Sequence, residues 1–72
     1  MAKQPVKNAL KETRIRRGIT QERLAQLAGL ARQSVISLER GRFLPTIETA
    51  LRLADSLEVA VEDLFWLTEK PK

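Results

Sequence analysis

The chain has 72 residues, of which 43% are hydrophobic and 31% charged, and its formal net charge is +4. A chain of this length buries a small core, so we expect residues 1–72 to form a single domain without a separate effector-binding module. It contains no His and no Cys. The commonest general base, metal ligand and thiol nucleophile are therefore missing, and we expect no catalysis, no metal site and no cofactor.

The same features indicate where the protein acts. Without Cys there is no disulfide framework of the kind that stabilises small secreted domains, and the first residues do not resemble a signal segment. The longest apolar run, Leu64–Leu67, is far shorter than the roughly 20 residues that cross a bilayer. We expect a cytoplasmic protein that makes no contact with membranes.

The charges are unevenly distributed along the chain. Residues 1–45 carry ten basic and three acidic side chains, whereas residues 46–72 carry three basic and six acidic ones. Such polarity is typical of a protein with one face toward a polyanion and another toward water or a second protein. By itself it is a weak signal, because small proteins are often lopsided by chance.

Apolar residues recur at intervals of three and four almost throughout, which predicts an all-α chain with no strand. A first helix is expected over Val6–Arg17, ended by Gly18. Thr20 then caps a second helix over Gln21–Ala28, which Gly29 ends. The residues of the second helix expected to face inward are Leu24, Leu27 and Ala28.

Three more helices are expected in the rest of the chain. A third covers Arg32–Arg40, with Val35 and Leu38 on its buried face. A fourth starts at Pro45 and Thr46, and a short fifth covers Val61–Trp66. The apolar stripe of the fourth helix is expected to consist of Ile47, Ala50, Leu51, Ala54 and Leu57. Residues 1–4 and a tail of residues 68–72 are expected to be frayed.

Residues 20–41, TQERLAQLAGLARQSVISLERG, carry the most specific pattern. Two short helices joined by a tight turn cross steeply, and they approach closely only where the contact residue is small, as Ala25 is. Gly29 permits the turn, Leu30 fills the space beneath it, and Val35 and Leu38 anchor the following helix. This combination predicts a helix-turn-helix motif over residues 21–40, with an ordinary helical hairpin as the alternative.

The segments RIRRG (14–18), TQERLAQLAG (20–29), RQSVISLERGRFLP (32–45) and VEDLF (61–65) together resemble the Cro and phage-repressor type of regulators, the XRE family. The resemblance covers residues 10–65 and is greatest to minimal single-domain bacterial and archaeal members. It implies a compact five-helix bundle of the lambda-repressor-like type. It also implies a regulator, expected to be a repressor, that binds double-stranded DNA sequence-specifically and so associates with the nucleoid.

The resemblance places the third helix in the major groove, where its early residues meet base edges. The corresponding residues here are Arg32, Gln33 and Ser37. Arg can donate two hydrogen bonds to guanine, and Gln can pair in the same bidentate way with adenine. Ile36 lies on the same side, where it would meet a thymine methyl group or the neighbouring loop. The alternative is an ordinary solvated helix face.

Other residues are expected to contact phosphates and so to position the protein without reading sequence. Gln21 starts the second helix, where amide donors point outward. Ser34, Arg40 and Arg42 flank the helix that enters the groove. Arg14 is expected to form an ion pair with Glu39, since each lies four residues after a core residue and the family commonly pairs these positions. Arg14 is also a candidate for reaching a phosphate.

Two residues depart from the family pattern. Ala31 stands where Ser or Thr usually caps the third helix, so a cap worth about 1 kcal/mol is missing. Glu58 occupies a position often held by Gly, and it would be slightly strained if the backbone there has a positive φ.

Members of the family commonly bind as dimers whose half-sites lie about 10 base pairs apart, so we expect a homodimer. Its interface is expected in the C-terminal part of the chain. Phe65, Trp66 and Leu67 cannot all face inward from so short a helix, so at least one of them is expected to contact the partner, with Trp66 or Leu67 favoured. The alternative is that all three merely cover the core.

Two rival functions remain open at this point. The domain could be an antitoxin-like or antagonist module whose main partner is another protein, although Arg32, Gln33 and the basic flanks argue against complete loss of DNA binding. It could also package DNA without sequence preference, which would show as a steep salt dependence with no preferred site.

Overall fold

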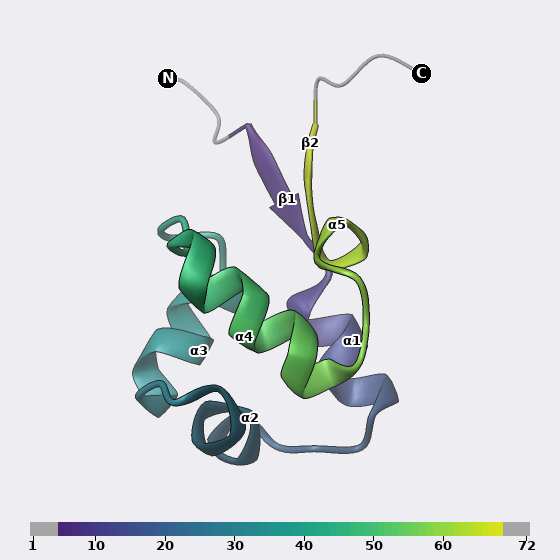
Figure 1. The fold of residues 1–72 in the computed structure, drawn as a ribbon. Helices are drawn as coiled ribbons and strands as arrows, with labels where there is room; N and C mark the ends of the chain where they lie inside the picture. The colour runs from purple at the N-terminus through teal and green to yellow at the C-terminus, as the bar shows by residue number, and fades with distance from the viewer. Residues whose placement is uncertain (1–4, 69–72) are drawn as a thin grey trace.

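The computed structural model describes residues 5–68. Its five helices are α1 (Leu10–Arg16), α2 (Gln21–Ala28), α3 (Arg32–Glu39), α4 (Ile47–Leu57) and α5 (Val61–Leu64). Two short strands, β1 (Val6–Asn8) and β2 (Phe65–Leu67), flank them in the sequence. Figure 1 shows the helices gathered into a bundle, with the two strands forming a ribbon that projects from it.

The helix boundaries follow from local hydrogen bonding. The Thr20 side chain accepts a hydrogen bond of 3.0 Å from the Arg23 amide, and Thr46 caps α4 through the Thr49 amide in the same way. Each cap satisfies one of the backbone donors that a helix N-terminus leaves without a partner. Gly29 ends α2 in the left-handed conformation, at φ 73°.

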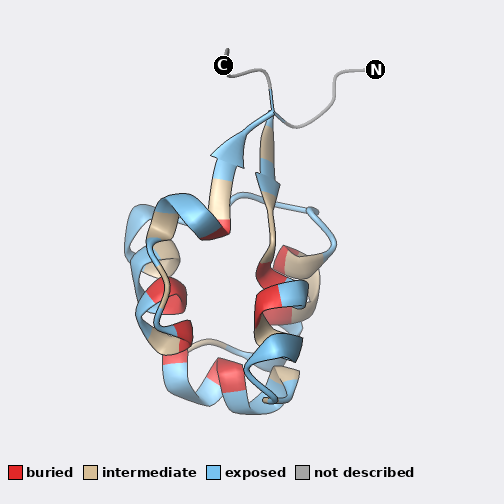
Figure 2. Cartoon of the chain, turned by 90° about the vertical axis from the view of Figure 1, so that its right-hand side faces the viewer, coloured by how far each residue is buried: buried red, intermediate tan, exposed pale blue. Residues whose placement is uncertain are grey.

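The core lies where the helices face one another, and the buried residues in Figure 2 line their inward sides. The side chains that are fully buried come from all five helices and are mostly leucines. The group consists of Leu10, Leu24, Val35, Leu38, Leu53, Leu57 and Leu64.

The expectation of an all-α chain is wrong at both ends of the domain. β1 and β2 pair antiparallel, with Val6 opposite Leu67 and Lys7 opposite Trp66. The first helix therefore begins at Leu10 rather than Val6, and α5 ends at Leu64 rather than Trp66. Three-residue strands are too short for an alternating pattern to be recognised, and their pairing joins distant parts of the sequence.

The tail expected to be frayed begins one residue later than predicted, because Thr68 is held in place. The Thr68 amide donates a hydrogen bond of 2.8 Å to the Pro5 carbonyl, which extends the contact between the two ends of the ribbon. The rest of the expected frayed ends, residues 1–4 and 69–72, lies outside the described residues.

Three residues expected to face inward are exposed instead. Leu27 is 45% exposed, Leu51 52% and Ile47 80%. On α4 the buried residues are Leu53, Ala54 and Leu57, so the prediction is confirmed for Ala54 and Leu57, whereas Leu53 is buried in place of Ile47 and Leu51. The reason is that α4 carries two adjacent apolar stripes, and periodicity does not say which of them is buried.

Ala31 and Glu58, the two departures from the family pattern, each affect the end of a helix in the way the sequence predicts. Ala31 begins α3 without a side-chain capping bond. Glu58 follows α4 at φ 59°, in the left-handed region that disfavours residues with a Cβ atom. Among the described residues, no helix is long and apolar enough to cross a membrane.

Candidate nucleic-acid interface

The connection between α2 and α3 is short and firmly held. The Leu30 amide donates a hydrogen bond of 2.8 Å to the Ala25 carbonyl, and Ala25 itself is buried between the helices. Because Ala25 has only a methyl group, the two helices can approach closely at this point. Val35 and Leu38 bury the inner side of α3 and leave its other side facing outward.

The outward side of α3 carries the residues expected to read bases. Arg32 and Gln33 are exposed, whereas Ser37 and Ile36 are half-buried. The Gln33 side-chain amide lies 3.5 Å from the Ser37 hydroxyl one turn later, at the limit of a hydrogen bond. These residues therefore lie on one accessible helix surface, as the sequence predicts.

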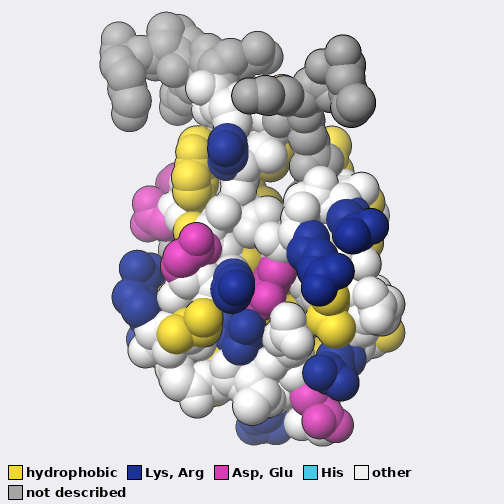
Figure 3. All heavy atoms as spheres, turned by 180° about the vertical axis from the view of Figure 1, so that it is seen from behind, with side chains coloured by type: hydrophobic (Ala, Val, Ile, Leu, Met, Phe, Trp, Pro, Cys, Tyr) yellow, Lys and Arg dark blue, Asp and Glu magenta, His cyan; other side chains and the backbone are white. Residues whose placement is uncertain are grey.

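A hollow of about 390 Å³ adjoins this surface. Three basic residues line it: Lys11 of α1, Arg32 at the start of α3 and Arg40 directly after the last residue of α3. Ile36 of α3 also lines it. Three cations around one concavity attract phosphate groups at long range. Figure 3 shows Lys and Arg side chains spread over the face seen from behind, with acidic side chains between them.

Glu39 also lines this hollow and joins three helices. Arg14 Nε donates to Glu39 Oε2 at 2.6 Å, and the side-chain nitrogen of Gln21, Nε2, donates to Glu39 Oε1 at 3.0 Å. The side chains of Arg14 and Glu39 are only 12% and 4% exposed. The expected ion pair is thus present, and it links α1 to the end of α3 with the first residue of α2 attached.

These hydrogen bonds fix the positions of the Gln21 and Arg14 side chains. Gln21 is half-buried, and its bond to Glu39 holds its side chain at the edge of the hollow. Arg14 also donates to the Ile19 carbonyl at 2.9 Å, so its place is chiefly structural. Both residues border a second hollow of about 420 Å³ together with Arg32. A phosphate contact by Arg14 stays a prediction.

The remaining phosphate candidates lie around the ends of α3. Ser34 is half-buried in its first turn, Arg40 follows its last residue, and Arg42 is exposed in the loop beyond. Of these three, only Arg40 lines a hollow described above. Ser34 and Arg42 flank the exposed surface without joining the cluster.

Sequence reasoning missed Asn8. Its side-chain oxygen accepts from the Leu10 amide at 3.0 Å, and its side-chain nitrogen donates to the Leu38 carbonyl at 3.1 Å. The signal available in the sequence was an Asn just before an apolar helical pattern, which is typical of a helix start. Predicting a helix from Val6 placed Asn8 inside that helix and hid this role.

The features above define a helix-turn-helix: two short helices cross at a tight turn, and the second is exposed along one side and flanked by basic residues. A family model described as "Helix-turn-helix" matches residues 10–64. The chain therefore belongs to this helix-turn-helix family, in agreement with the predicted XRE type, and is a DNA-binding transcriptional regulator.

Relatives and solved structures agree with this assignment. The chain is 38% identical to the uncharacterised helix-turn-helix transcriptional regulator YgzD of Bacillus subtilis, over 90% of this chain and 98% of YgzD. It is also 38% identical to the regulator MJ0272 of Methanocaldococcus jannaschii, over 83% and 91% of the two chains. The restriction-modification controller protein C.AhdI of Aeromonas hydrophila superimposes with a TM-score of 0.73 at 37% identity, covering 75% of this chain and 82% of C.AhdI.

Proposed function

We propose that the protein is a sequence-specific repressor that reads an operator half-site in the major groove with α3. The observation that carries this proposal is the exposed pair Arg32 and Gln33 at the start of α3, beside a hollow rimmed with cations. A dimer bound at an operator excludes other proteins from the same stretch of DNA, which is the simplest route to repression. No catalytic step is part of the proposal.

Arg32, Gln33, Ser37 and Ile36 are the proposed base-reading residues. Each bidentate contact by Arg or Gln would contribute about 1 to 3 kcal/mol of discrimination against a wrong base. Ile36 is half-buried between Arg32 and Arg40 along the helix, so its outer edge is suited to a thymine methyl group.

Phosphate contacts are proposed for Gln21, Ser34, Arg40 and Arg42. The proposed phosphate contact of Gln21 is supported by its hydrogen bond to Glu39, because a side chain that is already ordered loses less conformational entropy when DNA binds. Lys11 joins this set because it lines the same hollow as Arg40. These contacts would fix the register of the protein on the duplex and make its affinity strongly salt-dependent.

The protein is further proposed to act as a homodimer, through an apolar surface formed by α4, the loop before it and the ribbon. An apolar groove of about 220 Å³ lies there, lined in part by Val6, Leu44, Ile47 and Phe65. Leu51, one turn beyond Ile47, is also exposed. Exposed apolar residues clustered on so small a protein favour burial against a partner.

The ribbon distributes the three expected interface residues between its two faces. Phe65 lines the groove, and Leu67, two residues further along β2, lies on the same face. Trp66 lies on the opposite face, where it is paired with Lys7. We therefore place Phe65 and Leu67 in the proposed dimer interface and Trp66 at its outside.

The test is selection of bound sequences from a random duplex pool at near-physiological salt. Wild type is compared with an Arg32→Ala, Gln33→Ala double variant, shown to be folded by circular dichroism. Arg23→Ala is the matched control, because Arg23 is an exposed arginine on α2 that belongs to neither the proposed reading surface nor the proposed dimer surface. We expect wild type and the control to enrich an inverted repeat with half-sites about one helical turn apart, and the double variant to lose it.

Failure of wild type to enrich any site would contradict sequence-specific reading. DNA binding with a steep salt dependence would then favour a packaging role. Absence of DNA binding would favour an antitoxin-like module that binds another protein.

A further inference from the structure

Asn8 connects β1 to α1, which follows it directly, and to Leu38 of α3, which lies 30 residues further along the chain. It lies at the end of β1, opposite Phe65 of β2. Its side chain accepts a hydrogen bond from the first residue of α1 and donates one to the Leu38 carbonyl near the end of α3. The half-buried amide thus uses its oxygen for one helix and its nitrogen for the other.

The bond to Leu38 acts where α3 passes into the loop. The Leu38 carbonyl also accepts from the Gly41 amide at 3.0 Å, and the Arg42 amide donates to the Ser37 carbonyl at 3.0 Å. These bonds shape residues 38–42, the segment that carries Arg40 and Arg42. Its attachment to the rest of the domain therefore includes the Asn8 side chain.

We infer that Asn8 is a positioning residue for DNA binding: its amide fixes the end of α3 and thereby the placement of Arg40 and Arg42 against the DNA backbone. This inference rests on the proposed phosphate contacts of those two arginines. A contact to phosphate depends on placement of the guanidinium group, because a hydrogen bond weakens steeply once distance or angle departs from its optimum.

Two substitutions remove the hydrogen bond from Asn8 to Leu38 and keep the one from Leu10 to residue 8. Asn8→Asp has nearly the same shape and keeps an oxygen for the Leu10 amide, but it replaces the donor toward Leu38 with a second acceptor. Asn8→Ser removes the amide nitrogen that reaches Leu38 without adding charge, and its hydroxyl oxygen can still accept from the Leu10 amide. Both variants should fold, since each keeps an oxygen that can accept from the Leu10 amide at the start of α1.

The experiment is a double-mutant cycle read out as affinity for DNA. Asn8→Ser and Asn8→Asp are each combined with Arg42→Ala, and separately with Arg32→Ala as the matched control at the other end of α3. Affinities are measured on the selected operator and on a 30-base-pair duplex of random sequence, at a temperature where circular dichroism shows every variant folded. Phosphate contacts do not depend on sequence, so the cycle can be read on either duplex.

In the wild-type background we expect Arg42→Ala to weaken binding roughly tenfold, and in the Asn8→Ser background only about two- to threefold. The Arg32→Ala effect should be the same in both backgrounds. A purely structural role of Asn8 would change all affinities in parallel and leave both cycles additive. Additivity of Asn8 with Arg42 would therefore overturn the inference, as would unchanged affinity in Asn8→Ser.

Hydrogen exchange in the free protein gives a readout that does not involve DNA. In Asn8→Ser, exchange at the Gly41 and Arg42 amides should be faster by about tenfold, with no change at the Leu24 amide in α2. Equal exchange at Gly41 in variant and wild type would also overturn the inference. If wild type has no preferred site, the proposed sequence-specific function fails while the random-duplex cycle and the exchange rates still decide the role of Asn8.

Discussion

Arg14 of α1 and Glu39 of α3 form a charge-assisted hydrogen bond of 2.6 Å at a place where both side chains are nearly closed off from solvent. Glu39 also accepts from Gln21, so one carboxylate holds three helices around the proposed DNA-binding surface. Because both side chains are largely excluded from solvent, the attraction between them is strong. Removing one partner is destabilising, because the other is then left almost buried without its counter-charge.

Replacing Glu39 with Gln should therefore lower the free energy of unfolding by about 3 kcal/mol, because the Arg14 charge stays in the protein without its counter-charge. Urea denaturation of wild type and variant measures this difference. The loss is a large share of the stability of so small a domain.

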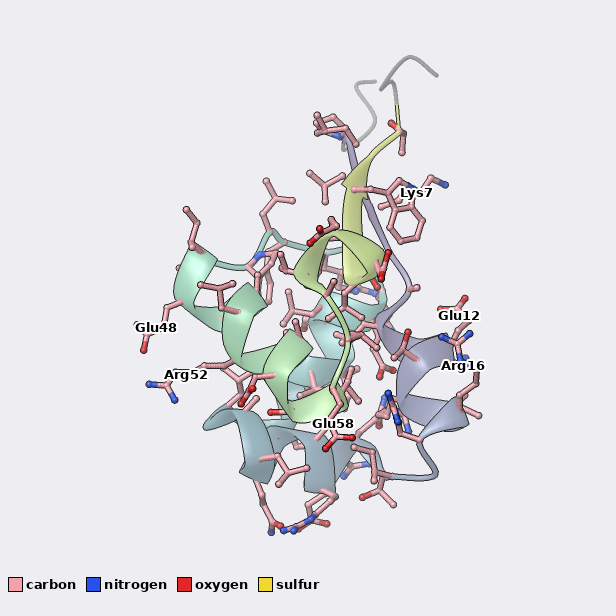
Figure 4. The ribbon with its side chains drawn as sticks, turned by 45° about the vertical axis from the view of Figure 1, so that its right-hand side comes forward. Lys7, Glu12, Arg16, Glu48, Arg52 and Glu58 are labelled. Carbon is pink, nitrogen blue, oxygen red and sulfur yellow. The ribbon has the colours of Figure 1, made fainter. Side chains whose placement is uncertain are left out.

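The exposed Glu48–Arg52 pair on α4 is the matched control. Its atoms approach to 2.9 Å, but the side chains are more than half exposed, and they point toward one another along the outside of α4 in Figure 4. Arg52→Met should change the free energy of unfolding by less than about 0.5 kcal/mol. Similar losses for the two pairs would show that burial does not govern the strength of the Arg14–Glu39 pair.

Glu58 offers a stabilising change. It adopts φ 59° at the end of α4, a conformation that a Cβ atom makes unfavourable by about 1 kcal/mol. Glu58→Gly should raise the free energy of unfolding by up to that amount. The Arg17 hydrogen bond to the Glu58 backbone carbonyl at 3.1 Å is kept, and the ion pair of Arg17 with the Glu58 carboxylate at 3.8 Å, which is lost, is exposed and contributes little.

Glu58→Ala serves as the comparison, since it removes the same carboxylate but keeps the Cβ atom. Thermal unfolding at matched pH and salt should place Glu58→Gly above wild type and Glu58→Ala at or below it. A gain of equal size in both variants would assign the effect to charge and not to the backbone conformation.

The helix-turn-helix could be predicted from sequence because its requirements are local. Ala25, Gly29 and Val35 lie within eleven residues, and each meets a steric demand that few residue types satisfy. The Arg14–Glu39 pair was also predictable, because each residue is placed by the helix it belongs to and by a resemblance that covers both.

The ribbon and the side of α4 that faces the core could not be predicted in the same way. The pairing of Val6 with Leu67 depends on where the completed bundle brings the two ends of the chain together. Ile47 and Leu53 both belong to plausible apolar stripes of one helix, and only the neighbouring helices decide that Leu53 is buried. Asn8 was missed because its role depends on the strand.

Ala31 gives a test of how α3 begins. It adopts the extended conformation of a helix-capping residue but has no side chain that can accept a hydrogen bond. Ala31→Ser should raise the free energy of unfolding by about 0.5 to 1 kcal/mol in urea denaturation. Thr20→Ala, which removes an existing cap from α2, should produce a loss of similar size. No gain in Ala31→Ser would indicate that the first turn of α3 is already held by its packing.

The proposed dimer surface can be tested at Ile47 of α4. Ile47 is 80% exposed, so Ile47→Glu should leave the stability of the monomer almost unchanged. In a dimer the same change would place a charge in an apolar interface, and sedimentation should show dissociation to monomers at concentrations where wild type is dimeric.

Ile15→Glu is the matched control, because Ile15 is 56% exposed on α1 and does not line the groove. If α4 forms the interface, Ile47→Glu weakens binding to the full inverted repeat more than binding to one half-site, because only the full operator engages both subunits. A dimer that survives Ile47→Glu would place the interface elsewhere, and dissociation by Trp66→Ala in the same assay would assign it to the opposite face of the ribbon.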